Sequence, residues 1–497
     1  MKRFFTDIAL WVVAVVICFI WRLSASKDAV WEYILQFGIL MVLWLALGAL
    51  FRLYRSYKVT PLWQAILSLL GTTVALLLIN LYVFPLWMPI STRPGIWVTS
   101  VVAICDLVII LVEHYWKYAT NITVPAMQIE HRSNAAVTRP DESRSQASIA
   151  TIRQSVLSIT TEADYQLLLD RASLNNRQTK VVANRDRFSL LQLPDYQYRT
   201  IVDLTLLNDA KGINRRFCIA NQKLPDDGCY VCCYRPQEYI KEKILKRYPK
   251  PINHIVYTCY FVWKRVIPRL LLTSRLYYDM TKGRKRMLSQ TEVYGRLYYC
   301  GFEVDDCVTM GHINYIFAHR RSQPYPQEQI KVYGPLIKLR RVGKDGNYIY
   351  IYKFRTMHPY AEYIQKYVFD QRGGMDIADK SNDDWRITTW GRFLRKYWLD
   401  ELPMLINWVR GDVKLVGIRP LSRTMFDTYP VALQEKRTRC KPGLIPPFYI
   451  DHPKTFEELF ASEEKYLDAY LQHPFRTDVS YFFRTIHSIL FRGIHSA

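Results

Sequence analysis

The first 117 residues hold four long apolar runs separated by short polar stretches. Three of the runs reach the roughly 20 residues that an α-helix needs to cross a bilayer core, and the first run is the shortest. Tryptophan and tyrosine stand near most of the ends, as is usual at membrane interfaces. The pattern therefore predicts four transmembrane helices within residues 1–117, at 5–21, 31–51, 62–88 and 96–116.

Residues 1–25 taken alone also fit a secretory signal peptide, with Lys2 and Arg3 as its charged start. Against this, Trp11 and Trp21 lie in the run, no small-residue cleavage site is clear, and three more apolar runs follow. We therefore interpret the first run as a membrane span.

Basic residues in the short connecting loops predict the orientation of these spans. Six lie before the first run, after the second and directly after the fourth taken together, against three in the other two loops. Because positive charge is retained on the cytoplasmic side, we expect the N-terminus and everything after residue 117 to be cytoplasmic.

The next part of the chain has a different pattern. Residues 118–160 are polar with little periodicity, which predicts a linker. In residues 161–321, strand-like segments such as 200–207, 229–235 and 312–320 alternate with helical patterns. This alternation predicts an α/β, Rossmann-like middle domain over residues 161–321. The segment also weakly resembles the C-terminal half of a class I methyltransferase fold.

No glycine-rich loop precedes this resemblance, so we expect a degenerate nucleotide fold that serves as a spacer or a dimerisation surface. Cys229, Cys232 and Cys233 form a CxxC without a second ligand pair, which favours strand cysteines over a zinc site. Residues 255–280 are apolar and aromatic but interrupted by basic residues. A helix lying in the membrane interface and a buried helix pair fit them equally well.

Composition and net charge limit the kinds of molecule that we expect this protein to bind. Half of the 497 residues are hydrophobic, which excludes a chain that is disordered throughout. The net charge of +23 requires an anionic partner: a nucleic acid, a phospholipid or a phosphorylated substrate. No nucleic-acid-binding motif and no concentrated basic stretch occurs, so we expect no nucleic-acid partner.

Residues 331–497 carry the most specific signals, beginning with a predicted hairpin at 334–357. Two alternating strands flank Asp345-Gly346, a pair suited to a tight turn with positive φ. The second strand presents Lys353 and Arg355 on one face, because strand side chains repeat every two residues.

Two adjacent carboxylates, Asp400 and Glu401, precede Leu402-Pro403 and a short apolar helix pattern that stops at Gly411. Asp is a favoured N-cap, so this pattern places both carboxylates at the positive end of a helix. The basic residues that surround them in the sequence are Arg386, Arg392, Arg395 and Arg419. Carboxylates, arginines and a helix N-terminus suit phosphoryl chemistry, although a plain helix cap with surface ion pairs is the commoner explanation of a bare Asp-Glu.

Five motifs favour phosphoryl chemistry over a plain helix cap. They are KFRTM, R-x-T-x-x-G-R-x-x-R, LDELP, LVGIRP and KPG, in this order. Together they resemble the bacterial sugar transferase family, the monotopic polyprenyl-phosphate phosphoglycosyl transferases. The resemblance implies an α+β catalytic domain over residues 331–497. It also implies the overall architecture of that family's large members, a multi-domain membrane protein with a four-helix transmembrane bundle.

The resemblance further implies roles for individual residues. Asp400 matches the nucleophile that attacks the β-phosphate of a UDP-sugar and expels UMP, and Glu401 matches its Mg²⁺-binding partner, so the dyad is the expected metal site. The expected substrate-binding residues are Lys353, Arg355, Arg386, Arg395, Arg419 and Asp478. The acceptor is undecaprenyl phosphate in the bilayer of the bacterial inner membrane, and a homodimer and downstream glycosyltransferases are further expected partners.

Three positions depart from the family pattern. Residues 322–333 are polar where an apolar re-entrant helix is usual, Met404 replaces the usual Gln, and 444–450 replace a Gly-Gln-rich run. The expected function is transfer of a sugar 1-phosphate that starts exopolysaccharide, capsule or O-antigen synthesis. The alternative is a catalytically decayed membrane scaffold that recruits glycosyltransferases.

Overall fold

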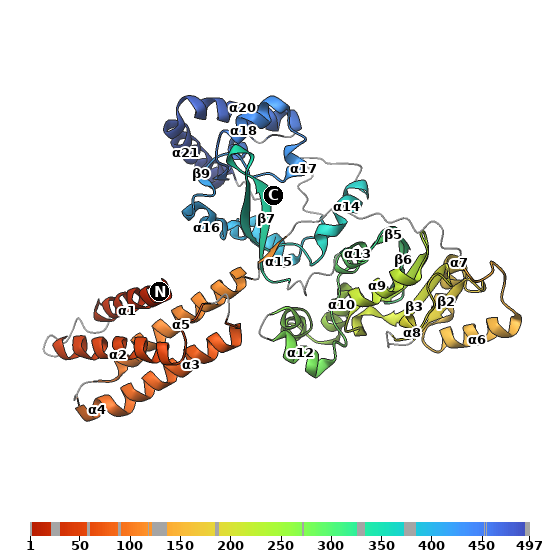
Figure 1. The fold of residues 1–497 in the computed structure, drawn as a ribbon, viewed down its shortest axis with the longest axis horizontal. Coiled ribbons are helices and arrows are strands. Elements are labelled where there is room, and N and C mark those ends of the chain that lie inside the picture. The colour runs from red at the N-terminus through yellow and green to blue at the C-terminus, as the bar shows by residue number, and fades with distance from the viewer. Residues whose placement is uncertain are drawn as a thin grey trace. The chain divides into compact units, whose positions relative to one another are not determined.

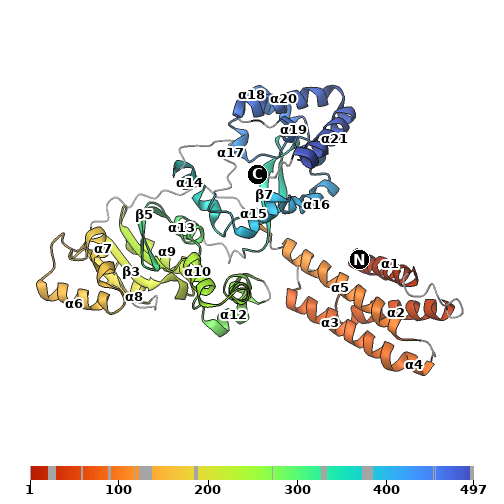
Figure 2. The same ribbon diagram turned by 180° about the vertical axis from the view of Figure 1, so that it is seen from behind.

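The computed structural model describes residues 2–20, 30–56, 60–87, 91–117, 119–121, 137–183, 188–270, 273–325, 333–371, 384–451, 453 and 455–492. The chain divides into two compact units, Met1–Ala119 and Thr120–Ala497 (Figures 1 and 2). Each unit is described by itself.

The first unit is entirely helical. Its helices are α1 (Lys2–Cys18), α2 (Val30–Leu50), α3 (Leu62–Leu78), α4 (Phe84–Trp87) and α5 (Arg93–Lys117). A π-helical turn joins α3 to α4, so that Leu62–Trp87 is one apolar helix. Among the described residues, three helices are long and apolar enough to cross a membrane: Val30–Leu50, Leu62–Trp87 and Arg93–Trp116. The protein is therefore a membrane-associated, multi-domain protein. The fourth expected span, α1, has only 17 residues and stays a prediction.

Buried polar side chains join the helices of this unit. The Asp7 carboxylate on α1 accepts hydrogen bonds from Trp44 Nε1 of α2 at 3.1 Å and from the Tyr54 hydroxyl at 3.0 Å. Gln36 Nε2 donates to Asn80 Oδ1 at 3.0 Å, linking α2 to the Leu62–Trp87 helix. Hydrogen bonds of this kind hold apolar helices together where burial of apolar surface alone does not.

A five-stranded mixed sheet forms the first part of the second unit. Its strands are β2 (Thr179–Val182), β3 (Thr200–Leu206), β4 (Cys229–Tyr234), β5 (Phe302–Met310) and β6 (Ile313–Arg320). The order is β2-β3-β4-β6-β5; the first three are parallel, and β6 is antiparallel to both of its neighbours. The strands predicted at 200–207, 229–235 and 312–320 are therefore present, and the cysteine cluster lies on β4. The Rossmann-like assignment stays a prediction.

Alternating side chains bury the two faces of this sheet against different helices. The helices are α6 (Gln146–Leu157), α7 (Glu162–Ala172), α8 (Phe188–Leu191), α9 (Ile213–Lys223), α10 (Gln237–Arg247), α11 (Ile252–Phe261), α12 (Ser274–Thr281) and α13 (Gln290–Tyr299). Val202 and Val231 pack with α6 and α7, whereas Ile201 and Tyr230 pack with α9 and α13. The predicted linker thus contains a helix, α6, whose Val156 is buried in the core.

The segment 255–280 combines features of both interpretations offered for it. Arg265 is buried and pairs with Glu292 of α13 at 2.7 Å, as a packed helix requires. Ile255 and Met280 nevertheless remain exposed, so the segment also presents apolar side chains to its surroundings.

A β-hairpin and a set of short helices form the remaining part. The strands are β1 (Thr120–Asn121), β7 (Leu336–Val342), β8 (Tyr348–Phe354), β9 (Lys414–Val416) and β10 (Gly443–Ile445). The helices are α14 (Gln365–Gln371), α15 (Thr389–Lys396), α16 (Met404–Val409), α17 (Arg423–Phe426), α18 (Val431–Thr438), α19 (Phe448–Asp451), α20 (Phe456–Gln472) and α21 (Pro474–Arg492). The expected hairpin is β7–β8, and its turn has positive φ at Asp345 and Gly346. Residues 326–332, in the stretch where the re-entrant helix is missing, lie outside the described residues.

The two parts of this unit pack directly on each other. A Cβ at Gly295 of α13 would lie 2.2 Å from the Tyr360 carbonyl oxygen, so only glycine allows this approach. The Arg296 guanidinium lies 4.4 Å from the centre of the Tyr360 ring, and Arg265 Nη2 lies 3.0 Å from His358 Nδ1. The middle part of the chain therefore supports the segment that follows β8.

Candidate active site

The two adjacent carboxylates lie in a tight turn between α15 and α16. Leu399–Glu401 form a 3₁₀ turn, entered through Trp398 with a left-handed φ of 53°. The sequence predicted Asp400 as the N-cap of the following helix. This prediction is wrong, because α16 begins only at Met404 and Pro403 precedes it. The turn leaves the Asp400 carboxylate without a capping role.

The Asp400 carboxylate is buried, but one of its oxygens lacks a hydrogen bond. The residue is 6 % exposed, and its Oδ1 has no hydrogen-bond partner among the described residues. Burial and the neighbouring Glu401 raise the pKa of Asp400, while Lys353 and Arg395 oppose the rise. A carboxylate oxygen without hydrogen bonds retains its lone pairs for an incoming electrophile.

Glu401 has the opposite electrostatic environment. Its Oε1 accepts from Lys353 Nζ of β8 at 2.5 Å. Burial alone would raise the pKa of Glu401, but Lys353 and Arg419 outweigh burial and lower it. The two neighbouring carboxylates thus have pKa values shifted in opposite directions, which is how adjacent acidic groups acquire different roles.

The motif R-x-T-x-x-G-R-x-x-R is explained by the contact between α15 and the end of the hairpin. Thr388 caps α15 by accepting from the Gly391 backbone N–H at 2.8 Å, and its own hydroxyl donates to the Thr356 carbonyl at 3.0 Å. Arg395 Nε, one helical turn later, donates to Thr356 Oγ1 at 3.0 Å. Thr356 therefore anchors both ends of α15 beside the dyad.

Gly391 makes this contact possible, and its replacement is a direct test. A Cβ at Gly391 would lie 2.0 Å from the Thr356 carbonyl oxygen. We expect Gly391→Ala to push α15 and Arg395 away from the dyad and to lower turnover by about 100-fold, because a shift of roughly 1 Å has an effect of this size. The melting temperature should also fall, since forced overpacking costs about 1–3 kcal/mol.

Gly212→Ala is the matched control for this variant, because the nearest atom to a Cβ there lies 3.7 Å away. Steady-state turnover and thermal melting of both variants measure the effect. Wild-type rates in Gly391→Ala would show that the placement of α15 does not control the site.

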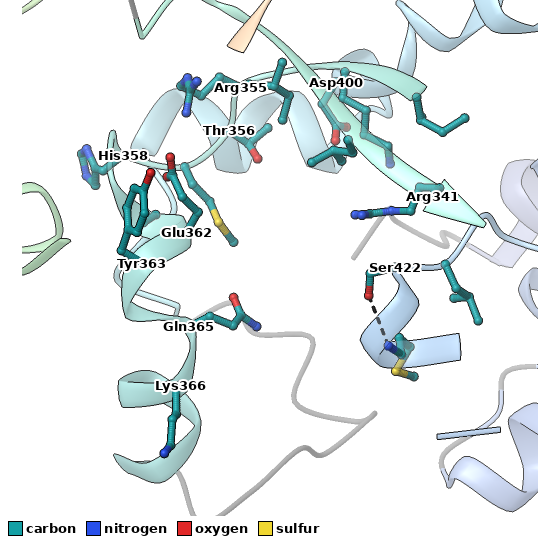
Figure 3. A pocket seen from close by; sticks show the side chains of 18 of the residues that line it. Arg341, Arg355, Thr356, His358, Glu362, Tyr363, Gln365, Lys366, Asp400 and Ser422 are labelled. Carbon is teal, nitrogen blue, oxygen red and sulfur yellow. Dashed lines mark hydrogen bonds between the residues drawn. The ribbon is translucent and has the colours of Figure 1, made fainter. Parts of the chain in front are cut away.

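The dyad faces a large cavity of about 1350 Å³ (Figure 3). Of the residues expected to bind substrate, Lys353, Arg355, Arg395 and Arg419 line this cavity, together with Asp400 and Glu401. Arg355 is fixed by a 3.0 Å hydrogen bond from its Nε to the Gly334 carbonyl, and its Nη2 is buried without a described partner. Burial lowers the pKa values of Arg355 and Arg395. The cavity therefore places several cations beside the unpartnered Asp400 oxygen.

Other lining residues were not anticipated. Arg341 of β7 points into the cavity (Figure 3), and burial together with Arg419 lowers its pKa to about 10. Tyr298 and Arg321, from the middle part of the chain, also line the cavity. Only the tertiary fold brings these residues to the site.

Two predicted site residues lie elsewhere. The Arg386 guanidinium is held by Asp384, with Nη2 2.6 Å from Oδ2, and donates to Gln365 Oε1 at 2.7 Å. The Asp478 carboxylate accepts from Lys414 Nζ at 3.0 Å and from the Tyr466 hydroxyl at 2.6 Å. Neither residue lines the cavity, and both serve as buried or half-buried ion-pair partners in the structure.

The two other departures from the expected pattern also fall at this site. Met404 is buried against Ile351 and Val413 and contacts the cavity. Leu444, Pro446 and Tyr449, within the unusual 444–450 segment, form part of the cavity wall. Mostly apolar side chains therefore line the cavity at the positions that depart from the family pattern.

The donor set suits a magnesium ion that is shared with substrate. Within the described ranges, no cluster of three or more His, Cys, Asp and Glu could hold a metal alone. Mg²⁺ usually binds through one or two carboxylates and substrate phosphates and keeps several waters. Asp400 and Glu401, with the unpartnered Asp400 Oδ1, fit this arrangement.

Comparison with known proteins covers this part of the chain. Residues 329–492 match the model of the bacterial sugar transferase family. The chain is 34 % identical over 141 residues to the galactosyl transferase CpsE of Streptococcus agalactiae, covering 28 % of this chain and 31 % of that protein. It is 38 % identical over 114 residues to a UDP-glucose:undecaprenyl-phosphate glucose-1-phosphate transferase of Caulobacter vibrioides, covering 22 % and 39 %. It is also 38 % identical over 94 residues to an undecaprenyl-phosphate galactose phosphotransferase of Salmonella typhimurium, covering 18 % and 20 %.

The chain therefore spans between 20 % and 39 % of the length of these three relatives. The matched segment contains the hairpin, α15, the dyad and four of the cavity arginines, Arg341, Arg355, Arg395 and Arg419. The five ordered motifs of the sequence fall in this same segment.

Proposed function

We propose, on the premise that residues 329–492 match the bacterial sugar transferase family, that this protein is a phosphoglycosyl transferase. It moves a sugar 1-phosphate from a UDP-sugar to undecaprenyl phosphate and releases UMP. The observation that carries the proposal is the buried, unpartnered Oδ1 of Asp400, which faces a cavity lined by two lysines and several arginines.

The first step of the proposed mechanism is attack of an Asp400 carboxylate oxygen on the β-phosphorus of the UDP-sugar. A phosphorus–oxygen bond to Asp400 forms, and the bond from the β-phosphorus to the bridging oxygen breaks, so that UMP leaves with the electron pair. Lys353, Arg395 and Arg419 neutralise the phosphate oxygens during this displacement. Asp400 and Glu401 would hold Mg²⁺, which would supply further charge neutralisation for the diphosphate.

The second step returns the enzyme to its starting state. An oxygen of undecaprenyl phosphate attacks the phosphorus of the phosphosugar–aspartate intermediate, and the bond to Asp400 breaks. The product is a diphosphate-linked lipid sugar, and the Asp400 carboxylate is regenerated. Splitting one displacement into two lets a single site handle a soluble donor and a lipid acceptor in turn.

A lipid acceptor requires a catalytic surface that reaches the bilayer. Exposed apolar side chains gather on α15 and α16, the helices on either side of the dyad: Trp390, Phe393, Tyr397, Leu405, Ile406, Trp408 and Val409. Scattered exposed apolar residues are normal, but a set of this size on two adjacent short helices marks an interaction surface. This surface supports membrane docking of the catalytic part where no re-entrant helix is evident.

Charge placed on this surface should impair use of the lipid acceptor alone. Val409 is 79 % exposed, so Val409→Asp should not disturb packing. We expect the variant to raise KM about tenfold for undecaprenyl phosphate in vesicles and to leave the rate with a short, water-soluble prenyl phosphate unchanged. Val431→Asp, at an exposed position of α18, is the control. Equal losses with both acceptors would assign Val409 a structural role instead.

The proposed location follows from the same substrates. We place the protein in the bacterial inner membrane as a multi-pass protein, with its N-terminus and catalytic part in the cytoplasm, where UDP-sugars are available. Its reaction would start the assembly of a lipid-linked exopolysaccharide, capsule or O-antigen.

Release of UMP tests the function directly. The full-length protein in vesicles that contain undecaprenyl phosphate and Mg²⁺ is offered a panel of UDP-sugars, and UMP is measured with and without the lipid. Release with at least one sugar, dependent on the lipid for multiple turnovers, is expected. Absence of turnover with the whole panel would favour the decayed scaffold.

A further inference from the structure

A second cavity, of about 460 Å³, lies in the middle part of the second unit. Its walls include Leu206 at the end of β3, Arg235 just after β4, and side chains of α10 and α11. The carboxyl ends of parallel strands are where open α/β sheets bind their ligands. The cavity shares no lining residue with the one that contains Asp400 and Glu401.

One buried asparagine fixes the floor of this second cavity. Asn208 Nδ2 donates to the carbonyl oxygens of Arg235 at 2.9 Å and Arg286 at 2.8 Å, and Asn208 Oδ1 accepts from the Arg235 backbone N–H at 2.7 Å. These bonds hold the end of β4 and the segment around residue 286 at fixed positions. Two arginines that are far apart in the sequence are thereby placed beside each other.

The lining carries an excess of positive charge. Its cations are Arg235, Lys243, Arg247, Lys285 and Arg286, and its one carboxylate is Asp209. Within the part of the chain that the structure describes, none of these five cations forms an ion pair. Five cations gathered with a single carboxylate raise the free energy of the fold unless a ligand neutralises them.

Unused donors indicate the same kind of ligand. Arg286 is 7 % exposed; its Nη1 donates to the Tyr278 hydroxyl at 3.1 Å and its Nη2 to the Ala210 carbonyl, but its Nε has no described partner. The Nε of Arg235 is likewise buried without one. Because buried donors are nearly always satisfied in folded proteins, an acceptor is expected at this position.

We propose that this second cavity is a binding site for a phosphate ester of about nucleotide size. Guanidinium groups match phosphate geometry, and the volume lies within the usual range for small-molecule pockets. Tyr239 and Tyr260 add aromatic surface to the walls beside the cations. The inference does not depend on the proposed transferase function, since it rests on residues outside 329–492.

Two sources offer this chemistry, a soluble phosphate ester and a phospholipid headgroup. The test uses the full-length protein in nanodiscs of phosphatidylcholine or of phosphatidylglycerol, with radiolabelled AMP and inorganic phosphate as probes in equilibrium dialysis. Lys243→Ala/Arg247→Ala removes two cavity cations at exposed positions of α10. Lys241→Ala/Lys246→Ala removes two exposed lysines of the same helix that do not line the cavity.

We expect AMP to bind in phosphatidylcholine nanodiscs, with affinity at least tenfold weaker in Lys243→Ala/Arg247→Ala and unchanged in the control. If AMP binds with the same affinity in phosphatidylglycerol nanodiscs, the ligand is a soluble phosphate ester. If AMP binding is lost in phosphatidylglycerol nanodiscs, the site binds a lipid headgroup. Melting temperatures confirm that both variants are folded. Affinity equal in the two variants, or no binding of either probe in either lipid, would overturn the proposal.

Discussion

Replacing Asp400 by asparagine should lower UMP release by at least about a thousandfold, because the variant lacks the oxygen nucleophile. Asparagine keeps the size of the side chain in the 3₁₀ turn, so the cavity and its arginines should remain in place. The measurement is UMP release in single-turnover and multiple-turnover assays with a UDP-sugar that the wild type accepts. Undiminished UMP release by Asp400→Asn would show that Asp400 is not the nucleophile.

The same variant should be more stable than the wild type at neutral pH. The pKa of Asp400 is raised by burial and by Glu401, so its ionised form is less favourable in the folded protein than in the unfolded chain. Asparagine removes that charge, and the melting temperature should therefore rise. The difference should narrow as the pH falls through the raised pKa, where wild-type Asp400 becomes protonated. Asp427→Asn, an exposed carboxylate paired with Arg423, is the matched control for both measurements.

Replacing Glu401 by glutamine should have the opposite effect on stability and should also reduce turnover. The pKa of Glu401 is lowered by Lys353 and Arg419 despite burial, so its charge stabilises the fold above its unfolded pKa, and that stability is lost as the pH falls through the lowered value. Glutamine would leave Lys353 Nζ, now 2.5 Å from Glu401 Oε1, in a mostly buried site without a counter-charge. Breaking a buried pair in this way costs on the order of 3 kcal/mol.

The accompanying loss of activity reflects the proposed Mg²⁺ site. We expect turnover to fall about 100-fold in Glu401→Gln and the Mg²⁺ concentration for half-maximal rate to rise, because one carboxylate ligand is lost. Chelation by EDTA should stop the wild-type enzyme, and added Mg²⁺ should restore it. Glu464→Gln, in an exposed pair with Lys436, is the control. A Mg²⁺ requirement in Glu401→Gln equal to that of the wild type would exclude Glu401 as a ligand.

Local sequence signals predicted local structure well. The Asp345-Gly346 hairpin and the stop of α16 at Gly411 depend on backbone preferences of a few consecutive residues, and both are present. The cap of the dyad helix was predicted wrongly, because the pattern around Leu402-Pro403 does not distinguish a helix start from a preceding 3₁₀ turn. The helix α1 has 17 residues, which is the lower end of the range for a membrane-spanning helix. Its length alone therefore does not distinguish a membrane span from a shorter helix.

Contacts formed only in the folded chain determine which side chains line the site. The 2.5 Å contact of Lys353 with Glu401 joins β8 to the dyad turn, and no sequence pattern specifies it. Arg340 and Arg341 are neighbours on β7 and point to opposite faces, so the sequence alone gave no reason to choose Arg341 for the cavity. Arg386 was expected to bind substrate because it is basic and near the dyad in sequence; in the structure it pairs with Asp384, two residues earlier, and its role in substrate binding stays a prediction.

The short strand β1 has a consequence for anyone who isolates the catalytic part of this protein. Thr120 and Asn121 pair in parallel with Ile337 and Lys338 of the hairpin, although more than 200 residues separate them in the sequence. A truncated chain that begins at residue 329 would expose this edge of β7 and would lose the cavity wall formed by Tyr298 and Arg321. A fragment that keeps this edge of β7 covered therefore needs residues 120–121 as well as the hairpin, and a peptide strand fused to the hairpin would supply them.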